Sequence, residues 1–183
     1  MSREINEKII DYLQKFDDSI KQKIIEDYHP ELKTHNYDEI NTFSKIIKDN
    51  KGNIIKLIDY KGKKLILFFY PKASTPGCTV EACNLRDNYS NFIKMGYGLL
   101  GVSADSAIRQ QKFIDKNNLP FPLLADVDKE VIMAYKVWGL KKFMGKEYDG
   151  IYRTTFVIDE NGVIEQIITK VKTKAHSEQL LGD

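Results

Sequence analysis

The sequence predicts an α/β domain in which helices cover both faces of a central mixed β-sheet. Three observations support this fold class. From about residue 43 onward, apolar runs typical of strands alternate with stretches typical of helices. The run at 65–70, LILFFY, is apolar throughout, which is typical of a strand buried on both faces. Near the carboxyl end, two apolar runs flank Glu160-Asn161-Gly162, a sequence that favours a β-hairpin.

The expected order begins with two strands, after which helices and strands alternate as far as the final pair of strands. Strands are expected in short runs dominated by apolar, β-branched and aromatic residues, at 54–59, 64–70, 97–103, 122–125, 152–159 and 163–169. Helices are expected where apolar residues recur at helical spacing among polar ones, at 79–95, 106–117, 129–135 and from about 174. A loop at 71–77 joins the buried second strand to the first helix.

Residues 1–41 differ in pattern and in charge, and we expect them to form a helical extension to the domain at 42–183. Their apolar residues recur three or four positions apart and form one helical stripe, namely Ile5, Ile9, Leu13, Phe16, Ile20 and Ile24. Proline follows His29 and ends this pattern, because the residue before a proline is displaced from the α region. Residues 1–40 carry a net charge of −4 and the remainder +6, so we expect the extension to dock on the domain. Pairing with a second copy or with another protein is the alternative.

The composition excludes several classes of protein. With 28 basic and 26 acidic residues, the chain has a net charge of only +2, so neither a nucleic-acid-binding protein nor a polybasic membrane binder is expected. The sequence lacks an apolar run of the roughly 18 residues that indicates a transmembrane helix, and its charged start does not resemble a signal peptide. Two cysteines and three histidines are too few for a Cys-rich zinc site or a disulfide scaffold, which favours a reducing, cytoplasmic setting.

Other polar and aromatic residues offer weaker signals. The three histidines lack the spacing of metal ligands, and we expect a surface position for His29, His35 and His176. Arg86 and Asp87 are expected to form a local ion pair on a helix. Four further side chains could either line a pocket or belong to the core, namely Tyr70, Trp138, Met144 and Tyr148. Neither a metal nor another cofactor is expected.

Cys78 stands where the loop gives way to a helix. At the first turn of a helix, unpaired amide groups and the positive end of the helix dipole lower the pKa of a thiol and favour the thiolate. Thr75 lies three residues earlier, close enough for its hydroxyl to reach the sulfur or the loop amides. The alternative is structural, with Cys78 as a small buried side chain and Thr75 as a helix cap.

Three stretches carry a resemblance to a known family. They are FFYPKASTPGCTVEACNLRDNY at 68–89, GVSADS at 101–106 and YKVWGLKKFMGKEYDGIYRTTFVID at 135–159. The first contains a highly specific Pro-x-x-x-Thr-x-x-Cys motif. Over residues 42–183 the sequence resembles the peroxiredoxins, in particular the bacterioferritin-comigratory-protein or peroxiredoxin Q branch. The resemblance implies a thioredoxin-like fold and a thiol-dependent peroxidase that reduces hydrogen peroxide and organic hydroperoxides without metal, flavin or nucleotide. Thioredoxin or a similar dithiol protein would recycle it.

The same resemblance implies roles for five residues. Cys78 would be the peroxidatic cysteine, which peroxide oxidises to a sulfenic acid. Pro71 would shield the thiolate, and Thr75 would form a hydrogen bond with the peroxide oxygens. Arg153, one of only four arginines in the sequence, would hold both the thiolate and the substrate. Cys83 would be the resolving cysteine, which condenses with the oxidised Cys78 to form a disulfide.

The spacing of the two cysteines has a physical consequence. In an ideal α-helix, residues five positions apart have Cα atoms about 8.6 Å apart and are rotated by about 140°, whereas a disulfide needs less than about 7 Å. A bond between Cys78 and Cys83 therefore requires the first turns of the helix to unwind, which predicts a helical reduced state and an opened oxidised state. If Cys83 is instead a packing residue, the enzyme would use one cysteine and an external thiol.

Two functions from other classes remain open. A thiol–disulfide oxidoreductase would carry Cys-x-x-Cys at the start of the helix, but residue 75 is a threonine. A redox-sensing binding module would use the extension at 1–41 to recruit a partner and the two cysteines as its switch. For the peroxidase we expect a monomer, with a dimer through the N-terminal helix as the alternative.

Overall fold

The computed structural model describes residues 46–143 and 145–182, which include both cysteines. Several expectations lie outside the described residues, namely the helical extension at 1–41, the boundary near residue 41, and the positions of His29, His35 and Met144. In the part of the chain that is described, no helix is long and apolar enough to cross a membrane.

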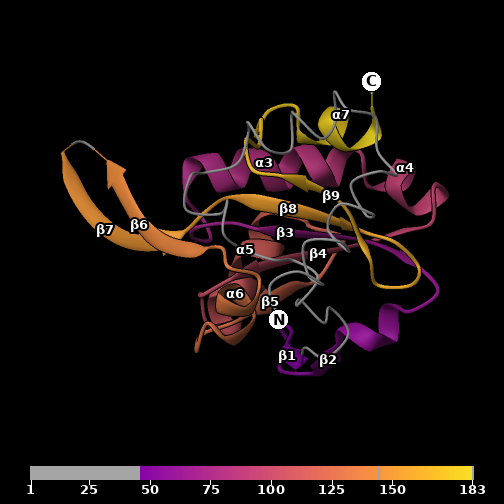
Figure 1. Ribbon diagram of the computed structural model, residues 1–183, viewed down its shortest axis with the longest axis horizontal. Helices are drawn as coiled ribbons and strands as arrows, with labels where there is room; N and C mark the ends of the chain where they lie inside the picture. Colours follow the sequence, from indigo (N-terminus) through magenta and orange to yellow (C-terminus); the bar gives the residue numbers. More distant parts are fainter. Residues whose placement is uncertain (1–45, 144, 183) are drawn as a thin grey trace, which may run out of the picture. The chain divides into compact units, whose positions relative to one another are not determined.

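The central sheet has five strands and is mixed, as the alternating pattern predicts (Figure 1). Its order is β5 (Leu123–Ala125), β4 (Tyr97–Ser103), β3 (Lys64–Phe69), β8 (Thr154–Ile158) and β9 (Ile164–Ile168). Strands β3, β4 and β5 pair in parallel, whereas β8 pairs antiparallel with both β3 and β9. The parallel strands are joined through helices, which are α3 (Pro76–Asp87), α4 (Tyr89–Lys94) and α5 (Ala107–Asn117).

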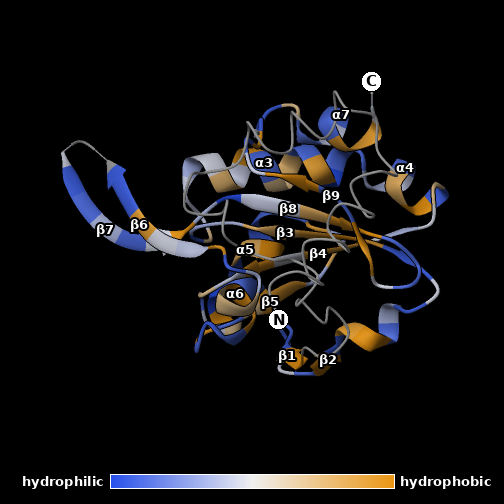
Figure 2. Ribbon diagram, in the orientation of Figure 1, coloured by the Kyte–Doolittle hydropathy of each residue, from blue (hydrophilic) through white to orange (hydrophobic). Residues whose placement is uncertain are grey.

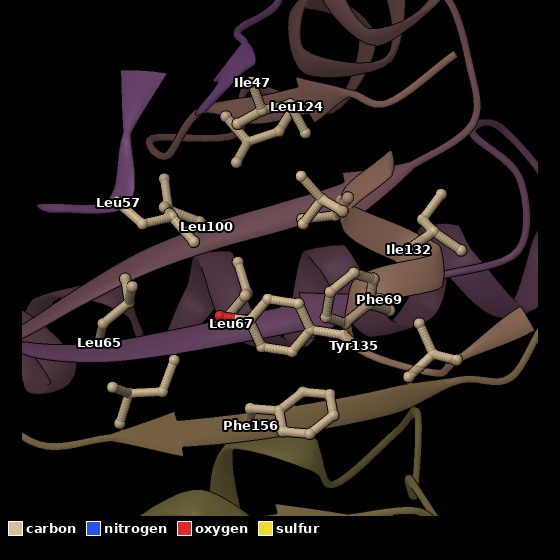
Figure 3. Packing of buried hydrophobic residues seen from close by; sticks show 14 of the residues in the cluster. Ile47, Leu57, Leu65, Leu67, Phe69, Leu100, Leu124, Ile132, Tyr135 and Phe156 are labelled. Carbon is tan, nitrogen blue, oxygen red and sulfur yellow. The ribbon is translucent and has the colours of Figure 1, made fainter. Parts of the chain in front are cut away.

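Strand β3 is buried on both faces because its successive side chains point to opposite sides of the sheet. One face enters a cluster that contains Tyr135 and Phe156, and it contributes Leu65, Leu67 and Phe69 (Figure 3). The other face packs against side chains of α3, α4 and α5, and it contributes Ile66 and Phe68, which Tyr70, the residue after β3, joins. The loop that follows β3 therefore starts from the most firmly packed part of the domain.

Helix α7 (His176–Leu181) lies against α3, and α6 (Glu130–Ala134) lies near the other end of the sheet (Figure 1). The Asn84 side chain of α3 forms one hydrogen bond with α7 and one with the segment just before it. Its Oδ1 atom accepts from the backbone N–H of Ser177 at 2.7 Å, and its Nδ2 atom donates to the carbonyl of Lys174 at 3.1 Å. The last helix of the domain is thereby fastened to the helix that carries both cysteines.

Two of the expected elements are divided in the structure. The strand expected at 54–59 is a short strand β2 (Ile54–Lys56) followed by a 3-10 helix η4 (Leu57–Tyr60), and β2 pairs with an unexpected strand β1 (Ile46–Lys48). The single helix expected at 79–95 is interrupted at Asn88, where the side-chain Nδ2 donates to the Asn84 carbonyl at 3.0 Å. This side chain occupies a carbonyl of the last turn of α3, and α4 starts in a new direction.

A hairpin of β6 (Trp138–Phe143) and β7 (Lys146–Ile151) is also unexpected. Its strands pair only with each other among the described residues, and it projects away from the five-stranded sheet (Figure 1). Most of its residues are hydrophilic, in contrast to those of β3 (Figure 2). A ribbon that is exposed on both sides has no alternation of apolar and polar residues that would reveal it.

Candidate active site

The loop at 71–75 delivers Cys78 to the first turn of α3. Thr75 is the N-cap residue, Pro76 is the first helical residue, and Cys78 follows two positions later. The Thr75 carbonyl accepts from both the backbone N–H and the hydroxyl of Thr79, each at 2.9 Å. The Thr75 hydroxyl donates to the Lys72 carbonyl at 2.9 Å. Its hydrogen is thus engaged by the loop, and its oxygen keeps the capacity to accept.

Arg153 contacts the sulfur of Cys78. Its Nη2 atom donates to Cys78 Sγ at 3.2 Å, and Cys78 is only 2% exposed. The register of the sheet explains the contact, because Thr154 of β8 pairs with Phe69, the last residue of β3. Arg153 therefore lies beside the point where the chain leaves the sheet for the loop and α3. The structure thus brings the predicted pair of Cys78 and Arg153 together.

A glutamate that the sequence analysis overlooked holds the other side of the guanidinium. Glu81 is fully buried, and its Oε2 atom accepts from Nη1 of Arg153. It lies three residues after Cys78 on α3, a spacing that puts the two side chains on one face of the helix. Burial alone would lower the pKa of Arg153, but Glu81 and Cys78 outweigh this effect and raise it. Arg153 is therefore a fixed positive charge between a carboxylate and a thiol.

The surface position expected for His176 is wrong. The side chain is fully buried, with Nδ1 at 3.2 Å from Glu81 Oε1 and Nε2 at 3.0 Å from the Thr155 hydroxyl. Polar groups at this depth need partners, and Nε2 has one in the Thr155 hydroxyl of β8, whereas Nδ1 lies beside Glu81 of α3 without a hydrogen bond among the described residues. The expectation failed because a lone histidine in a polar segment gives no sign of partners that are distant in the sequence. In the described residues, no group of three or more His, Cys, Asp or Glu side chains could hold a metal ion.

Cys83 is half-buried and lies on a different side of α3 from Cys78. Its Sγ atom is 3.9 Å from Oδ1 of Asn117, at the end of α5. Arg86 reaches the same residue and donates to its carbonyl at 2.7 Å, while also forming the expected ion pair with Asp87 at 2.8 Å. Both cysteines are free thiols in one uninterrupted helix. The structure thus does not bring Cys83 together with Cys78.

Two further residues that the sequence analysis overlooked hold the loop in place. Asp105 Oδ2 accepts from the backbone N–H of Ala73 at 2.6 Å, and Arg109 Nη2 donates to the Ala73 carbonyl at 3.0 Å. Asp105 and Arg109 also pair with each other at 3.0 Å. The ion pair of Asp105 and Arg109 at the start of α5 therefore holds both the N–H and the carbonyl of Ala73. Pro71, the first residue of the same loop, is half-buried.

The remaining aromatic candidates divide between core and surface. Tyr70 is buried, and its hydroxyl contacts Gln110. Burial raises the pKa of Tyr70, so the hydroxyl stays protonated and belongs to the core. Tyr148 is exposed on the hairpin, and Trp138 lies half-buried with the Lys129 ammonium 5.1 Å from its ring centre. Neither has a contact with Cys78 that the structure records.

Replacing Asp105 with alanine is expected to slow about tenfold the reaction with peroxide that the family resemblance implies for Cys78, because the loop loses its position. The buried N–H of Ala73 would lose its acceptor, which costs about 1–3 kcal/mol of unfolding free energy. Stopped-flow kinetics and urea denaturation measure the two effects. Asp115→Ala serves as the control, since Asp115 is an exposed aspartate of α5 that bonds only to Gln111 in the described structure. Equal behaviour of the two variants would contradict the anchoring role.

Comparisons with known proteins identify the family. The model of the AhpC/TSA family matches residues 38–167. The chain belongs to the AhpC/TSA family of peroxiredoxins. Peroxiredoxin Bcp of Bacillus subtilis is 47% identical over 135 residues, which is 74% of this chain and 86% of the relative. A putative peroxiredoxin bcp of Coxiella burnetii is 50% identical over 133 residues, which is 73% of this chain and 88% of the relative.

Solved structures agree with this peroxiredoxin assignment. The bacterioferritin comigratory protein of Xanthomonas campestris superposes with a TM-score of 0.73 at 35% identity, over 77% of this chain and 89% of that one. AhpC of Enterococcus faecalis, at 21% identity and a TM-score of 0.61, supports the fold alone. The resemblance to the Bcp or peroxiredoxin Q branch is thereby confirmed, together with the thioredoxin-like fold around a mixed sheet. The peroxiredoxin is a thiol peroxidase.

Proposed function

We propose that Cys78 is the residue that peroxide oxidises in this peroxiredoxin, and that its substrates are hydrogen peroxide and alkyl hydroperoxides. The observation that carries the proposal is the contact of 3.2 Å between Arg153 Nη2 and Cys78 Sγ at the first turn of α3. The structure of the Xanthomonas campestris relative is described in terms of alkyl peroxide reduction activity. That activity supports the inclusion of alkyl hydroperoxides among the substrates.

In the first step, the Cys78 thiolate attacks one peroxide oxygen and the O–O bond breaks. The second oxygen leaves with the electron pair of that bond and takes up a proton as water or an alcohol, while Cys78 becomes a sulfenic acid. Arg153 faces the sulfur and stabilises the charge that develops on the departing oxygen. The Thr75 oxygen accepts a hydrogen bond from the peroxide, because its own hydrogen is held by Lys72. Pro71 limits the access of water to the sulfur.

In the second step, the Cys83 thiol attacks the sulfur of the sulfenic acid, a disulfide forms, and water leaves. The reduced structure holds Cys83 beside Asn117 and away from Cys78, so α3 has to unwind before this step. A dithiol protein of the thioredoxin type then reduces the disulfide by exchange, which supplies the two electrons and requires a reducing, cytoplasmic setting. The cycle needs neither a metal nor another cofactor.

Intact-mass measurement after one equivalent of hydrogen peroxide, with reductant removed, tests the assignment of both cysteines. The wild-type protein is expected to lose about two mass units as the disulfide forms, and Cys83→Ser to gain about 16 as a sulfenic acid. Cys78→Ser is the matched control and should keep its mass. A gain of oxygen in the wild type as well would remove Cys83 from the cycle. An unchanged mass in both reactive proteins would contradict the role of Cys78.

A further inference from the structure

A buried histidine contacts Glu81, the partner of Arg153, and has no part in the cycle described above. His176 comes from α7, 95 residues after Glu81 in the sequence, and both side chains are fully buried. Glu81 Oε1 and His176 Nδ1 are 3.2 Å apart, and neither atom forms a hydrogen bond among the described residues. Buried polar atoms need partners, and each of these two has the other as its neighbour.

The contacts of His176 complete a series of four side chains whose two ends, Arg153 and Thr155, lie on the same stretch of backbone. Arg153 contacts Glu81 on α3, Glu81 contacts His176 on α7, and His176 contacts Thr155, two residues after Arg153. In the tautomer that carries its hydrogen on Nδ1, that nitrogen faces Glu81 Oε1 as a donor and Nε2 accepts from the Thr155 hydroxyl. His176 therefore sets the orientation of Glu81 from the side opposite to Arg153. His176 is itself held by Thr155 of β8, the strand that follows Arg153.

Glu81 competes with Cys78 for the single positive charge of Arg153, because the guanidinium uses Nη1 for one and Nη2 for the other. An N–H of His176 at the 3.2 Å contact with Oε1 supplies a second group for this carboxylate besides Arg153. Without that donor, a fully buried carboxylate has Arg153 as its only partner among the described side chains. The guanidinium is then drawn toward Glu81 and away from the sulfur.

We propose that His176 is a positioning residue for the reaction with peroxide, acting through Glu81 to keep Arg153 directed at Cys78. The proposal rests on the role of Cys78 stated above. It makes the C-terminal helix a part of the reactive centre, although no residue of that helix contacts the sulfur in the described structure.

The test compares three substitutions of His176 in the full chain with Cys83→Ser as the parent, so that only the first step is observed. Asparagine places an amide near the position of Nδ1, glutamine places one near Nε2, and leucine removes both contacts. The second-order rate constant with hydrogen peroxide is expected to fall about tenfold in His176→Leu and His176→Gln, and less than about threefold in His176→Asn. If His176→Leu fails to fold, the asparagine and glutamine variants decide the question by themselves.

Two controls separate positioning from packing. Asn84→Ala removes the hydrogen bonds of α3 with α7 and with the segment just before it, and should leave the rate constant unchanged. In a Glu81→Gln background, His176→Leu should cause no further loss, because the two residues act in series. A rate within twofold of the parent in His176→Leu would overturn the proposal and leave the role of Cys78 intact. Equal losses in His176→Asn and His176→Leu would overturn it too. A parent whose Cys78 does not react with peroxide would instead remove the proposed function, and this inference with it.

Discussion

Replacing Arg153 with methionine is expected to lower the rate constant of Cys78 with hydrogen peroxide by about 10²- to 10³-fold. That range is typical of losing one preorganised donor to a developing negative charge. Arg153 is the guanidinium that faces the sulfur, so its loss removes both the stabilisation of the thiolate and the stabilisation of the leaving oxygen. Stopped-flow measurement on Cys83→Ser protein isolates this step.

The same substitution is expected to destabilise the fold by about 3–5 kcal/mol, because it leaves a buried charge without its counter-ion. Glu81 is fully buried, and Arg153 is its cationic partner at Oε2. The double variant Arg153→Met/Glu81→Gln removes the charge and should recover most of the stability in urea denaturation, but none of the rate. Recovery of the rate along with the stability would show that Arg153 serves only the fold. Arg153→Lys should remain slow, since one ammonium cannot reproduce the planar fork.

Formation of the disulfide is expected to raise the hydrogen-exchange rates of amides 78–84 by at least about 100-fold. The reduced helix keeps Cys78 and Cys83 too far apart for a bond, so the oxidised protein loses the helical hydrogen bonds of this segment. Glu81 leaves Arg153 and His176 at the same time, because it lies between the two cysteines on the same turns. Mass spectrometry of exchanged peptides from the reduced and the peroxide-treated protein measures the difference.

This experiment has two controls, one within the same molecule and one in a variant. Strand β3 (Lys64–Phe69) is buried on both faces and should keep its protection in both redox states. Cys83→Ser treated with peroxide should also keep protection at 78–84, since it forms no internal disulfide. If a verified disulfide leaves the protection at 78–84 unchanged, the expected unwinding of α3 does not occur.

The sequence is sufficient to predict the features that depend on local pattern. Continuous apolar residues at 65–70 indicate the central strand, and the loop with Pro71, Thr75 and Cys78 indicates the start of a helix. The contact of Arg153 with Cys78 was predicted by resemblance, and the pairing of β8 with β3 explains it. The strand and the helix start follow from the local sequence. The contact between Arg153 and Cys78 is distant in the sequence, and the family resemblance already implied it.

Features that depend on tertiary partners could not be predicted. His176 lies in a charged segment, and only Glu81 and Thr155, which are distant in the sequence, account for its burial. The hairpin of β6 and β7 pairs with itself and buries little, so no apolar periodicity marks it. Three overlooked residues could have been found from their spacing. Glu81 stands three residues after Cys78 on an expected helix. Asp105 and Arg109 are an acidic and a basic residue four positions apart at a helix start.

Cys78, Arg153 and His176 come from parts of the chain that are made at different times. Arg153 lies 75 residues after Cys78, and His176 follows it by more than twenty residues. When a ribosome has just completed α3, neither of them exists, and the thiol has no guanidinium beside it. On the roles proposed here, full reactivity toward peroxide is therefore acquired only when β8 and α7 have joined the domain. In an unfinished chain that lacks Arg153, Cys78 is then expected to react with peroxide more slowly than in the complete domain.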